Sequence, residues 1–307
     1  MMRALNLLIF TTFYSFYAAA PATALSQRVA ATYNFVWKGM LVSTAKTTAE
    51  ISSEAYSLNA EVRMRGLAKL FAGSGKTTFS ANGRVGVDGN IQPQEYSSNG
   101  KWKGHAYRER LTYDLDGNLS AVVQDWPEKW KKENAREPVP EAMQNGYDPA
   151  SMFVALMSKR FLFQSTASEA HPAVYKVFDG DTVVSWSVNC ANAPVWLEKT
   201  KHSTGGQAHE CVFSRELLAG QRIFPVNHKA KKSRPVSKRR KGRGRKASAK
   251  PYDGPLTIWI RQLENSEIWM PVQALLPSEK GTVKMYLKEL TFVAPEAQQI
   301  AMNASSR

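Results

Sequence analysis

The stretch Tyr33–Val42 reads Tyr-Asn-Phe-Val-Trp-Lys-Gly-Met-Leu-Val, so that its apolar and polar residues alternate. Successive side chains of a β-strand point to opposite faces, and Tyr33, Phe35 and Trp37 would therefore share one face. Gly39 permits a bend or bulge, after which the chain can continue as a curled or hairpin-paired strand. The stretch predicts a sheet with one apolar and one polar face.

The same alternation recurs along most of the chain. It is clearest in Glu54–Arg65, where Tyr56, Leu58 and Met64 fall on one face and the intervening residues are polar. Further strands are predicted at residues 40–51, 76–87, 94–98, 103–115, 119–124, 173–178, 182–190, 195–201, 209–218, 256–263, 268–275 and 282–292. The expected fold is mainly β, with a single curled antiparallel sheet in the form of a half-barrel, a β-clam or a barrel-like body.

One helix is predicted in this β-rich chain. Asp148 is a favourable N-cap residue, and Pro149 suits the first helical turn. Apolar residues recur at spacings of three and four through Pro149–Leu162, which predicts an amphipathic helix packed against the concave face of the sheet. The preceding residues 126–147 carry prolines and charges without a period and are predicted to form a long loop.

Residues 1–24 are predicted to be a signal peptide. Arg3 precedes an apolar run at residues 5–17, and Ala22-Thr23-Ala24 supplies the small-x-small pattern that signal peptidase requires. Cleavage is expected after this triplet, with residues 18–20 as the second choice. The apolar run is short for a membrane span, which makes an uncleaved anchor the less favoured alternative.

The cleaved product is expected in the periplasm. No cysteine near the cleavage site would carry a lipid, and no later stretch is long and apolar enough for a transmembrane segment. Residues 25–293 are predicted to form a single β-rich domain, and residues 294–307 a polar tail.

The two cysteines, Cys190 and Cys211, both lie well inside the mature chain. In an oxidising compartment, two cysteines that close a short loop most simply form a disulfide. A metal site is the alternative, because His202, His209 and Glu210 lie nearby. The metal site is less favoured, since no pair has the spacing typical of zinc ligands.

The net charge of +15 comes mostly from one segment. Residues 229–250 contain twelve Lys or Arg and no Asp or Glu, so the remainder of the chain carries only +3. This composition cannot bury a core and predicts a disordered basic insert. The insert could bind an anionic envelope surface, or it could be a tolerated loop insertion. Nucleic acid is the less expected partner, because the insert has no aromatic residues for base stacking. The residues expected to contact an anionic surface are Arg239, Arg240, Lys241, Arg243 and Arg245.

No catalytic motif stands out. The run Gly73–Thr78 ends like a phosphate-binding loop, but Leu70 occupies the position of the required first glycine. The five histidines form no metalloprotease motif, and no nucleophile elbow accompanies them. These histidines are His105, His171, His202, His209 and His228. No cofactor and no metal are expected, and an envelope hydrolase with an unrecognised site stays an alternative.

Aromatic residues supply the candidate binding surface. They would either fill an ordinary core or line a cavity for a lipid or another apolar molecule. The predicted set on the concave face is Tyr33, Phe35, Trp37, Tyr56, Tyr107, Glu109, Trp186 and Trp259. Glu109 is unusual there, because an unpaired carboxylate on an apolar face is costly. It would contact a ligand, pair with an inward arginine, or mark a slip in the strand register, and the slip is the preferred interpretation.

Several short motifs, taken in order, carry a family resemblance. They are Tyr-x-Phe-Val-Trp-x-Gly-Met from Tyr33, Gly66-Leu67, Asp148-Pro149-Ala150-Ser151, Val177-Phe178-Asp179-Gly180, the Cys190 and Cys211 pair, Trp259-Ile260 and Met270-Pro271-Val272. Together they make Tyr33–Phe292 resemble the uncharacterised bacterial exported family known as domain of unknown function 3108. The resemblance implies a periplasmic location and a curled antiparallel sheet, loosely similar to half-barrel lipoprotein carriers and envelope β-clams. It implies no activity and no catalytic residues, and the basic insert departs from the family pattern.

These observations favour a non-enzymatic envelope protein. It would bind an apolar envelope component on the concave face of its sheet, or it would act as a scaffold for other envelope proteins. The alternatives are the hydrolase and a protein that binds anionic surfaces through the basic insert.

Overall fold

The computed structural model describes residues 26–66, 68, 75–102, 104–158, 172–223, 255–264, 266–278 and 281–293. The predicted signal peptide, basic insert and polar tail lie outside these residues. Within the described part, no helix has the length and apolar character needed to cross a membrane.

The protein is mainly β, as predicted, and its strands form one large antiparallel sheet of 14 strands. The first seven are β1 (Gln27–Trp37), β2 (Met40–Ile51), β3 (Ala55–Met64), β4 (Lys76–Val85), β5 (Ile91–Trp102), β6 (His105–Tyr113) and β7 (Leu119–Asp125). The others are β8 (Ala173–Phe178), β9 (Val183–Cys190), β10 (Val195–Leu197), β11 (Gly206–Ala219), β12 (Leu256–Gln262), β13 (Trp269–Leu276) and β14 (Val283–Val293). Their order is β7-β6-β5-β4-β3-β2-β1-β14-β13-β12-β11-β9-β8, and β10 pairs with β11.

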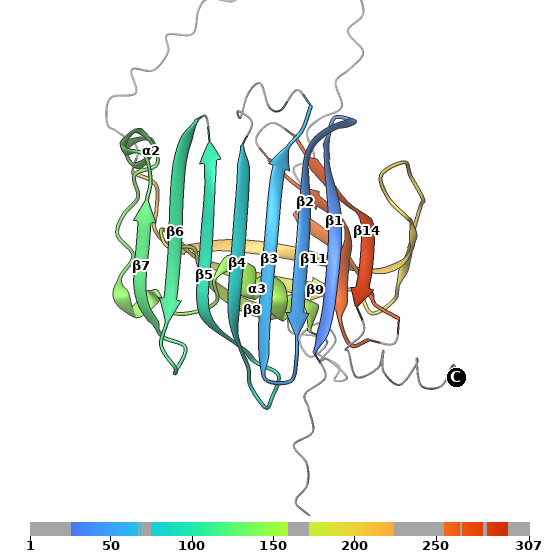
Figure 1. The fold of residues 1–307 in the computed structure, drawn as a ribbon, viewed down its shortest axis with the longest axis horizontal. Helices are drawn as coiled ribbons and strands as arrows, with labels where there is room; N and C mark the ends of the chain where they lie inside the picture. The colour runs from blue at the N-terminus through green and yellow to red at the C-terminus, as the bar shows by residue number, and fades with distance from the viewer. Residues whose placement is uncertain are drawn as a thin grey trace, which may run out of the picture.

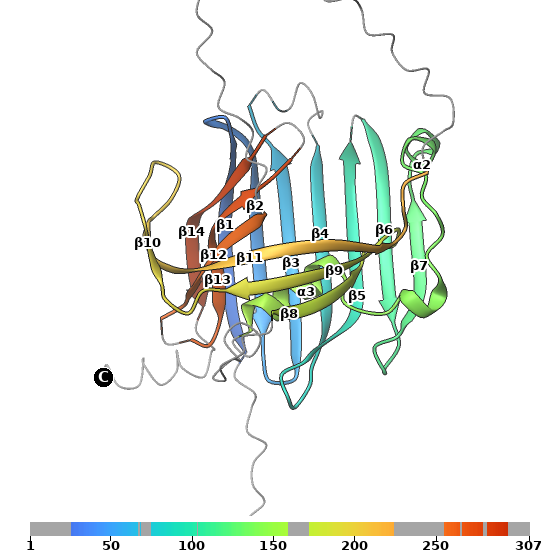
Figure 2. The same ribbon diagram turned by 180° about the vertical axis from the view of Figure 1, so that it is seen from behind.

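The sheet is open and not strongly curled. Strands β7 to β1 stand side by side in a row (Figure 1), and the sheet changes direction at β14, β13 and β12. Strands β11, β9 and β8 then run across the far side of that row (Figure 2). The barrel-like alternative is wrong for the described residues, because the two end strands, β7 and β8, are not paired with each other.

The opening stretch forms the hairpin of β1 and β2. Its turn is Lys38-Gly39, and both residues have positive φ, 48° and 80°, which suits a tight two-residue hairpin turn. The burial of β1 does not follow the expected strict alternation, because Tyr33, Asn34 and Val36 are buried while Phe35 and Trp37 are half-buried. The pairing of β1 with β2 is also irregular after Phe35, where the register skips Val42 of β2.

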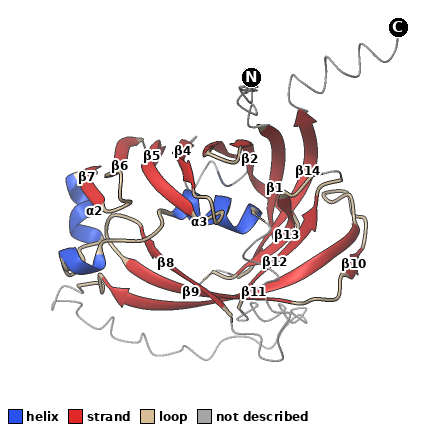
Figure 3. Ribbon diagram, turned by 90° about the horizontal axis from the view of Figure 1, so that it is seen from below, coloured by secondary structure: helices blue, strands red, loops and turns tan. Residues whose placement is uncertain are grey.

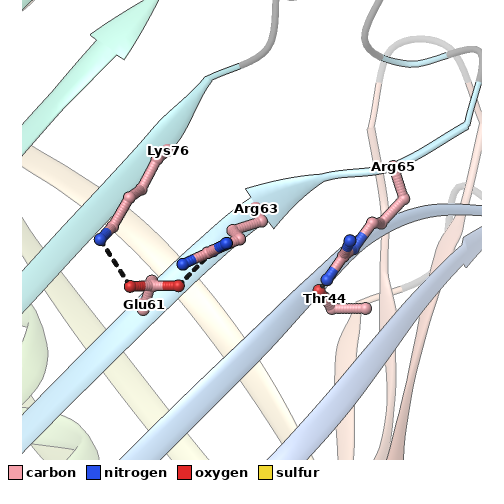
Figure 4. Close-up of polar contacts among 5 residues, drawn as sticks. All are labelled: Thr44, Glu61, Arg63, Arg65 and Lys76. Atoms are coloured by element: carbon pink, nitrogen blue, oxygen red, sulfur yellow. Dashed lines mark hydrogen bonds and ion pairs between the residues drawn. The ribbon is translucent and has the colours of Figure 1, made fainter.

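The outer face of β2, β3 and β4 is polar. Figure 4 shows Glu61 between Arg63 and Lys76, with its carboxylate 2.7 Å from the Lys76 ammonium group. Nearby, the Arg65 guanidinium donates to the Thr44 hydroxyl at 3.0 Å. Exposed ion pairs of this kind contribute little to stability, but they keep this face hydrated. The two-faced sheet expected from the sequence is therefore present.

The helix α3 (Pro149–Met157) lies between the row of strands and the crossing strands (Figure 3). It contacts β3, β4 and β5 on one side and β8 and β13 on the other. Because both layers cover it, six of its nine residues are buried, and it is less amphipathic than predicted. It also ends before the predicted Leu162, because Ser158 takes an extended conformation and forms a β-bridge with Ile268.

The predicted long loop at residues 126–147 contains two short helices. They are α2 (Glu128–Glu133) and the 3₁₀-helix η1 (Glu141–Met143). Pro127 precedes α2, and ion pairs join Lys131 to Glu128 and Lys129 to Glu133 along it. The absence of buried residues in α2 explains why no apolar period marks it in the sequence.

The predicted disulfide is confirmed. Cys190 in β9 and Cys211 in β11 are directly opposite in neighbouring strands, and their sulfur atoms are bonded to each other. The alternative metal site is not supported, since the described residues contain no group of three His, Cys, Asp or Glu that could hold a metal ion.

Removing this disulfide should lower stability without changing the fold. The double variant Cys190→Ala with Cys211→Ala frees a loop with a sequence separation of 21, whose closure contributes about 3 kcal/mol to the free energy of unfolding. Guanidinium denaturation of the variant and of the oxidised wild type measures the difference. Reduced wild type is the control and should match the variant, whereas equal midpoints for oxidised wild type and variant would contradict this role.

Candidate functional site

A buried polar cluster fixes the start of α3. Asp148 is fully buried, and its Oδ1 accepts hydrogen bonds from the backbone N–H groups of Ala150 and Ser151, both at 2.8 Å. The Ser151 hydroxyl donates to Asp148 Oδ2, and the Tyr56 hydroxyl lies 2.6 Å from Ser151 Oγ. Because the Ser151 hydrogen points to Asp148, Tyr56 is the donor in the second bond. This chain of hydrogen bonds ties α3 to β3.

An apolar pocket of about 510 Å³ opens on the opposite side of α3. We call this cavity the apolar pocket. Its walls are formed by Met152, Phe153 and Leu156 of α3, Val184 and Trp186 of β9, and Phe213 of β11. The Trp186 ring meets the Phe213 ring edge-on, with 6.3 Å between centroids, which holds the indole in place. Two charged residues, Asp179 and Arg215, also line it.

A second cavity, of about 410 Å³, lies beside the first and is lined by carboxylates and aromatic rings. We call this cavity the acidic pocket. Glu109 reaches it from β6, and Asp179 and Asp181 reach it from the turn between β8 and β9. Asp179 lines both cavities, so the two pockets adjoin at this residue.

The turn that supplies the two aspartates is held close to β7. Gly180 has φ 97°, a conformation that residues with a side chain rarely adopt, and its Cα faces the Gln124 amide of β7. Asp179 Oδ1 accepts hydrogen bonds from the N–H groups of Asp181 and Thr182. A tight turn with glycine at its centre thus places two carboxylates opposite Glu109.

The electrostatics of the acidic pocket favour uptake of a proton or a cation. Burial, followed by the charges of Asp179 and Asp181, raises the pKa of Glu109 to about 7. Burial also raises the pKa of Asp181, against the lowering effects of the Gln124 side chain and, to a smaller extent, of Arg136. Arg136 itself donates to the Gly220 carbonyl at 2.9 Å.

The predicted concave-face residues fall into separate places. Tyr107 and Glu109 line the acidic pocket, and Trp186 lines the apolar pocket. The remaining aromatic residues do not line these cavities: Tyr33 and Tyr56 are buried in the core, Phe35 and Trp259 pack against it, and Trp37 lies under the Lys38 ammonium group.

The preferred interpretation of Glu109 was wrong. The pairing of β5 with β6 passes through Ser98 and Glu109 without a shift, and the irregularity of β6 falls between Thr112 and Tyr113. Glu109 therefore keeps the same face as Leu111, and its carboxylate reaches the pocket.

Sequence reasoning missed several residues of the acidic pocket. Asp179 and Asp181 lie between two predicted strands and were not among the predicted binding residues, and Trp126, Trp130 and Arg136 lie in the predicted loop. Two acids on either side of a hairpin glycine were the available signal. Their position opposite β6 follows from the crossing of the two layers, which local pattern does not show.

The described histidines are dispersed. His105 is exposed at the start of β6, His202 stacks on Tyr286, and His209 meets Trp269 edge-on. His171 and His228 lie outside the described residues, as do the five basic residues expected to contact an anionic surface. Binding of such a surface stays a prediction.

The fold and disulfide define an open antiparallel β protein with few helices, and the disulfide suggests an extracytoplasmic location. Residues 32–193 match the family described as protein of unknown function (DUF3108). Because the match spans more than half of the chain, the protein belongs to this family, as the sequence motifs indicated. The resemblance between residue 194 and Phe292 stays a prediction. No curated protein matches the chain.

Stability should fall as pH rises through the titration of Glu109. Its pKa is raised in the folded state, so its favourable contribution is complete below about 4.5 and is lost as pH approaches about 7. Asp148 acts with the same sign, because burial raises its pKa to about 6. We expect Glu109→Gln to raise the free energy of unfolding at pH 8 by roughly 1 kcal/mol, a value reduced for partial exposure, and to leave it nearly unchanged at pH 4.

Urea denaturation at pH 4, 6 and 8 measures this dependence. Glu95→Gln is the matched control, since Glu95 lies on the other face of β5 and pairs with Arg110 at 3.5 Å. Equal pH dependence of wild type and Glu109→Gln would contradict the assignment.

Proposed function

We propose that the protein is a non-enzymatic envelope protein of the periplasm that binds an apolar or amphiphilic molecule in the apolar pocket. In this proposal the crossing layers act as a β-clam, and α3 forms one wall of the binding site. The observation that supports it is the cavity of about 510 Å³ whose walls combine aliphatic, thioether and aromatic side chains.

The lining side chains favour an apolar occupant. Phe153, Leu156 and Trp186 are only half-buried although they lie between the layers of the fold. Each square ångström of apolar surface that a ligand covers contributes about 25 cal/mol, so filling such a cavity is favourable. The charged Asp179 and Arg215 offer polar contacts to a head group.

The geometry gives the hydrolase alternative no support. The dispersed histidines of the described residues do not meet a hydroxyl and a carboxylate in one cleft. The two aspartates and Glu109 line one cleft. Its lining contains no cysteine, lysine or histidine, and its one serine, Ser98, is buried. We therefore favour binding over catalysis.

Replacing the aromatic wall should weaken binding. Trp186→Ala removes the largest side chain of the apolar pocket, and we expect about tenfold weaker binding of dodecanol, equivalent to about 1.4 kcal/mol. Isothermal titration calorimetry on the full mature chain measures the affinity, and circular dichroism checks the fold.

Trp196→Ala is the control for this variant. Trp196 lies on β10, is 74% exposed and does not line the apolar pocket, so its loss should leave the affinity unchanged. Absence of saturable dodecanol binding to the wild type would overturn the proposal, as would equal affinities for wild type and Trp186→Ala.

A further inference from the structure

The acidic pocket carries negative charge that the described residues do not neutralise. Glu109, Asp179 and Asp181 line it, and no ion pair within 4.0 Å joins any of them to a cation in the described part of the chain. The one cationic side chain in the lining is Arg136, whose charge lowers the pKa of Asp181 from beyond ion-pair distance while its guanidinium donates to the Gly220 carbonyl. Glu109 and Asp181 are half-buried, whereas Asp179 is exposed and accepts hydrogen bonds from Asp181 and Thr182 within its turn. A half-buried carboxylate without an ion-pair partner is costly, so Glu109 and Asp181 favour a positively charged occupant.

The walls of the pocket suit a cation that carries alkyl groups. Trp126, Trp130 and Tyr107 present rings to the cavity, and the Tyr107 and Trp130 centroids are 5.8 Å apart. The Tyr107 hydroxyl is held by Thr77 at 3.0 Å, which fixes the ring. Aromatic faces attract ammonium groups through their quadrupole, and the attraction is larger where water is excluded.

The floor of the cavity is part of the protein interior. Tyr96 and Ser98 line it from β5, and they are only 5% and 2% exposed. The acidic pocket therefore extends between the side chains of the inner face of the sheet. Trp130 of α2 lines the cavity beside Tyr107 of β6.

The junction of the two cavities constrains the shape of the ligand. Asp179 lines both the acidic pocket and the apolar pocket, so a molecule with its head in the first can extend its chain into the second. An anionic head would meet three carboxylates, and a neutral head would leave their charge unbalanced. A molecule with a cationic head group and an alkyl tail would match the charge of the acidic pocket and the apolar surface of the apolar pocket.

We propose that the ligand is an alkylammonium amphiphile, whose ammonium group lies in the acidic pocket among Glu109, Asp179 and Asp181 while its chain lies in the apolar pocket. This inference rests on the proposed function, because it assigns the head group of the same ligand. The ammonium group could belong to a membrane lipid or to a free long-chain amine, and both present the same chemistry to the pocket.

Calorimetry with three probes of equal chain length tests the inference. At pH 8 and moderate salt, dodecylamine, dodecanol and dodecanoate are titrated, each below its micelle concentration, into the full mature chain. We expect dodecylamine to bind at least tenfold more tightly than dodecanol, and dodecanoate to bind most weakly. Vesicles of phosphatidylglycerol, which has no ammonium group, with and without phosphatidylethanolamine then distinguish the sources. Depletion of phosphatidylethanolamine from the vesicles indicates a lipid ligand, and its retention together with tight dodecylamine binding indicates a free amine.

Variants of the carboxylate residues test whether the preference for dodecylamine arises in the acidic pocket. Glu109→Gln should reduce the ratio of dodecylamine to dodecanol affinity about tenfold and leave dodecanol binding unchanged. Asp181→Asn should act in the same direction. Glu95→Gln, the same chemical change on the outer face, should leave the ratio unaltered. Measurement of unfolding curves for each variant shows that it is folded.

The outcomes separate this inference from the proposed function. Equal affinities for the three probes, all weakened by Trp186→Ala, would overturn the ammonium assignment and leave apolar binding standing. A preference for dodecanoate would also overturn it. Absence of binding by all three probes would overturn both proposals.

Discussion

The hydrogen bonds from Tyr56 through Ser151 to Asp148 are the constraint on which the arrangement of the two layers depends. They form a buried polar chain at the start of α3, and one of their donors comes from β3. A buried carboxylate without partners would cost several kcal/mol, so the satisfied cluster strongly favours this one position of the helix. Proline at the first helical position adds a backbone already set for the helix.

The position of α3 also determines how the space between the row of strands and the crossing strands is filled. The helix separates β3, β4 and β5 from β8, and side chains fill the centre of that space. The apolar pocket lies between α3 and the crossing strands β9, β11 and β12, and the acidic pocket lies between β4, β5 and β6, residues 126–136 and the β8–β9 turn. The disulfide joins β9 to β11 at the core, where Cys211 is fully buried. The helix therefore shapes the apolar pocket directly, and the acidic pocket adjoins it at Asp179.

Local pattern predicted the parts of the fold that depend on neighbours in sequence. Alternation identified β3 because its inner residues Tyr56 and Leu58 are buried while its outer residues meet water. Asp148 was identified as an N-cap from the same kind of local evidence. The disulfide was predictable because two cysteines in a chain with a predicted export signal most simply bond to each other.

The features that were not predicted depend on contacts between distant residues. Ser158 ends the helix because it pairs with Ile268, more than a hundred residues away. The sheet changes direction at β14, β13 and β12, so a single curl was not formed. Glu109 follows the alternation of its strand without a slip, and only the distant Asp179 and Asp181 explain its surroundings.

Amide hydrogen exchange of α3 tests the central claim most directly. If the Asp148 cluster holds the helix between the layers, the amides of Val154, Ala155 and Met157 should exchange as slowly as those of β3 in the wild type. In Asp148→Ala they should exchange at least tenfold faster while β1 to β5 stay protected, and Asp148→Asn, which keeps an acceptor for the backbone N–H groups, should fall between the two. Fast exchange of α3 in the wild type, or equal protection in Asp148→Ala, would contradict the account.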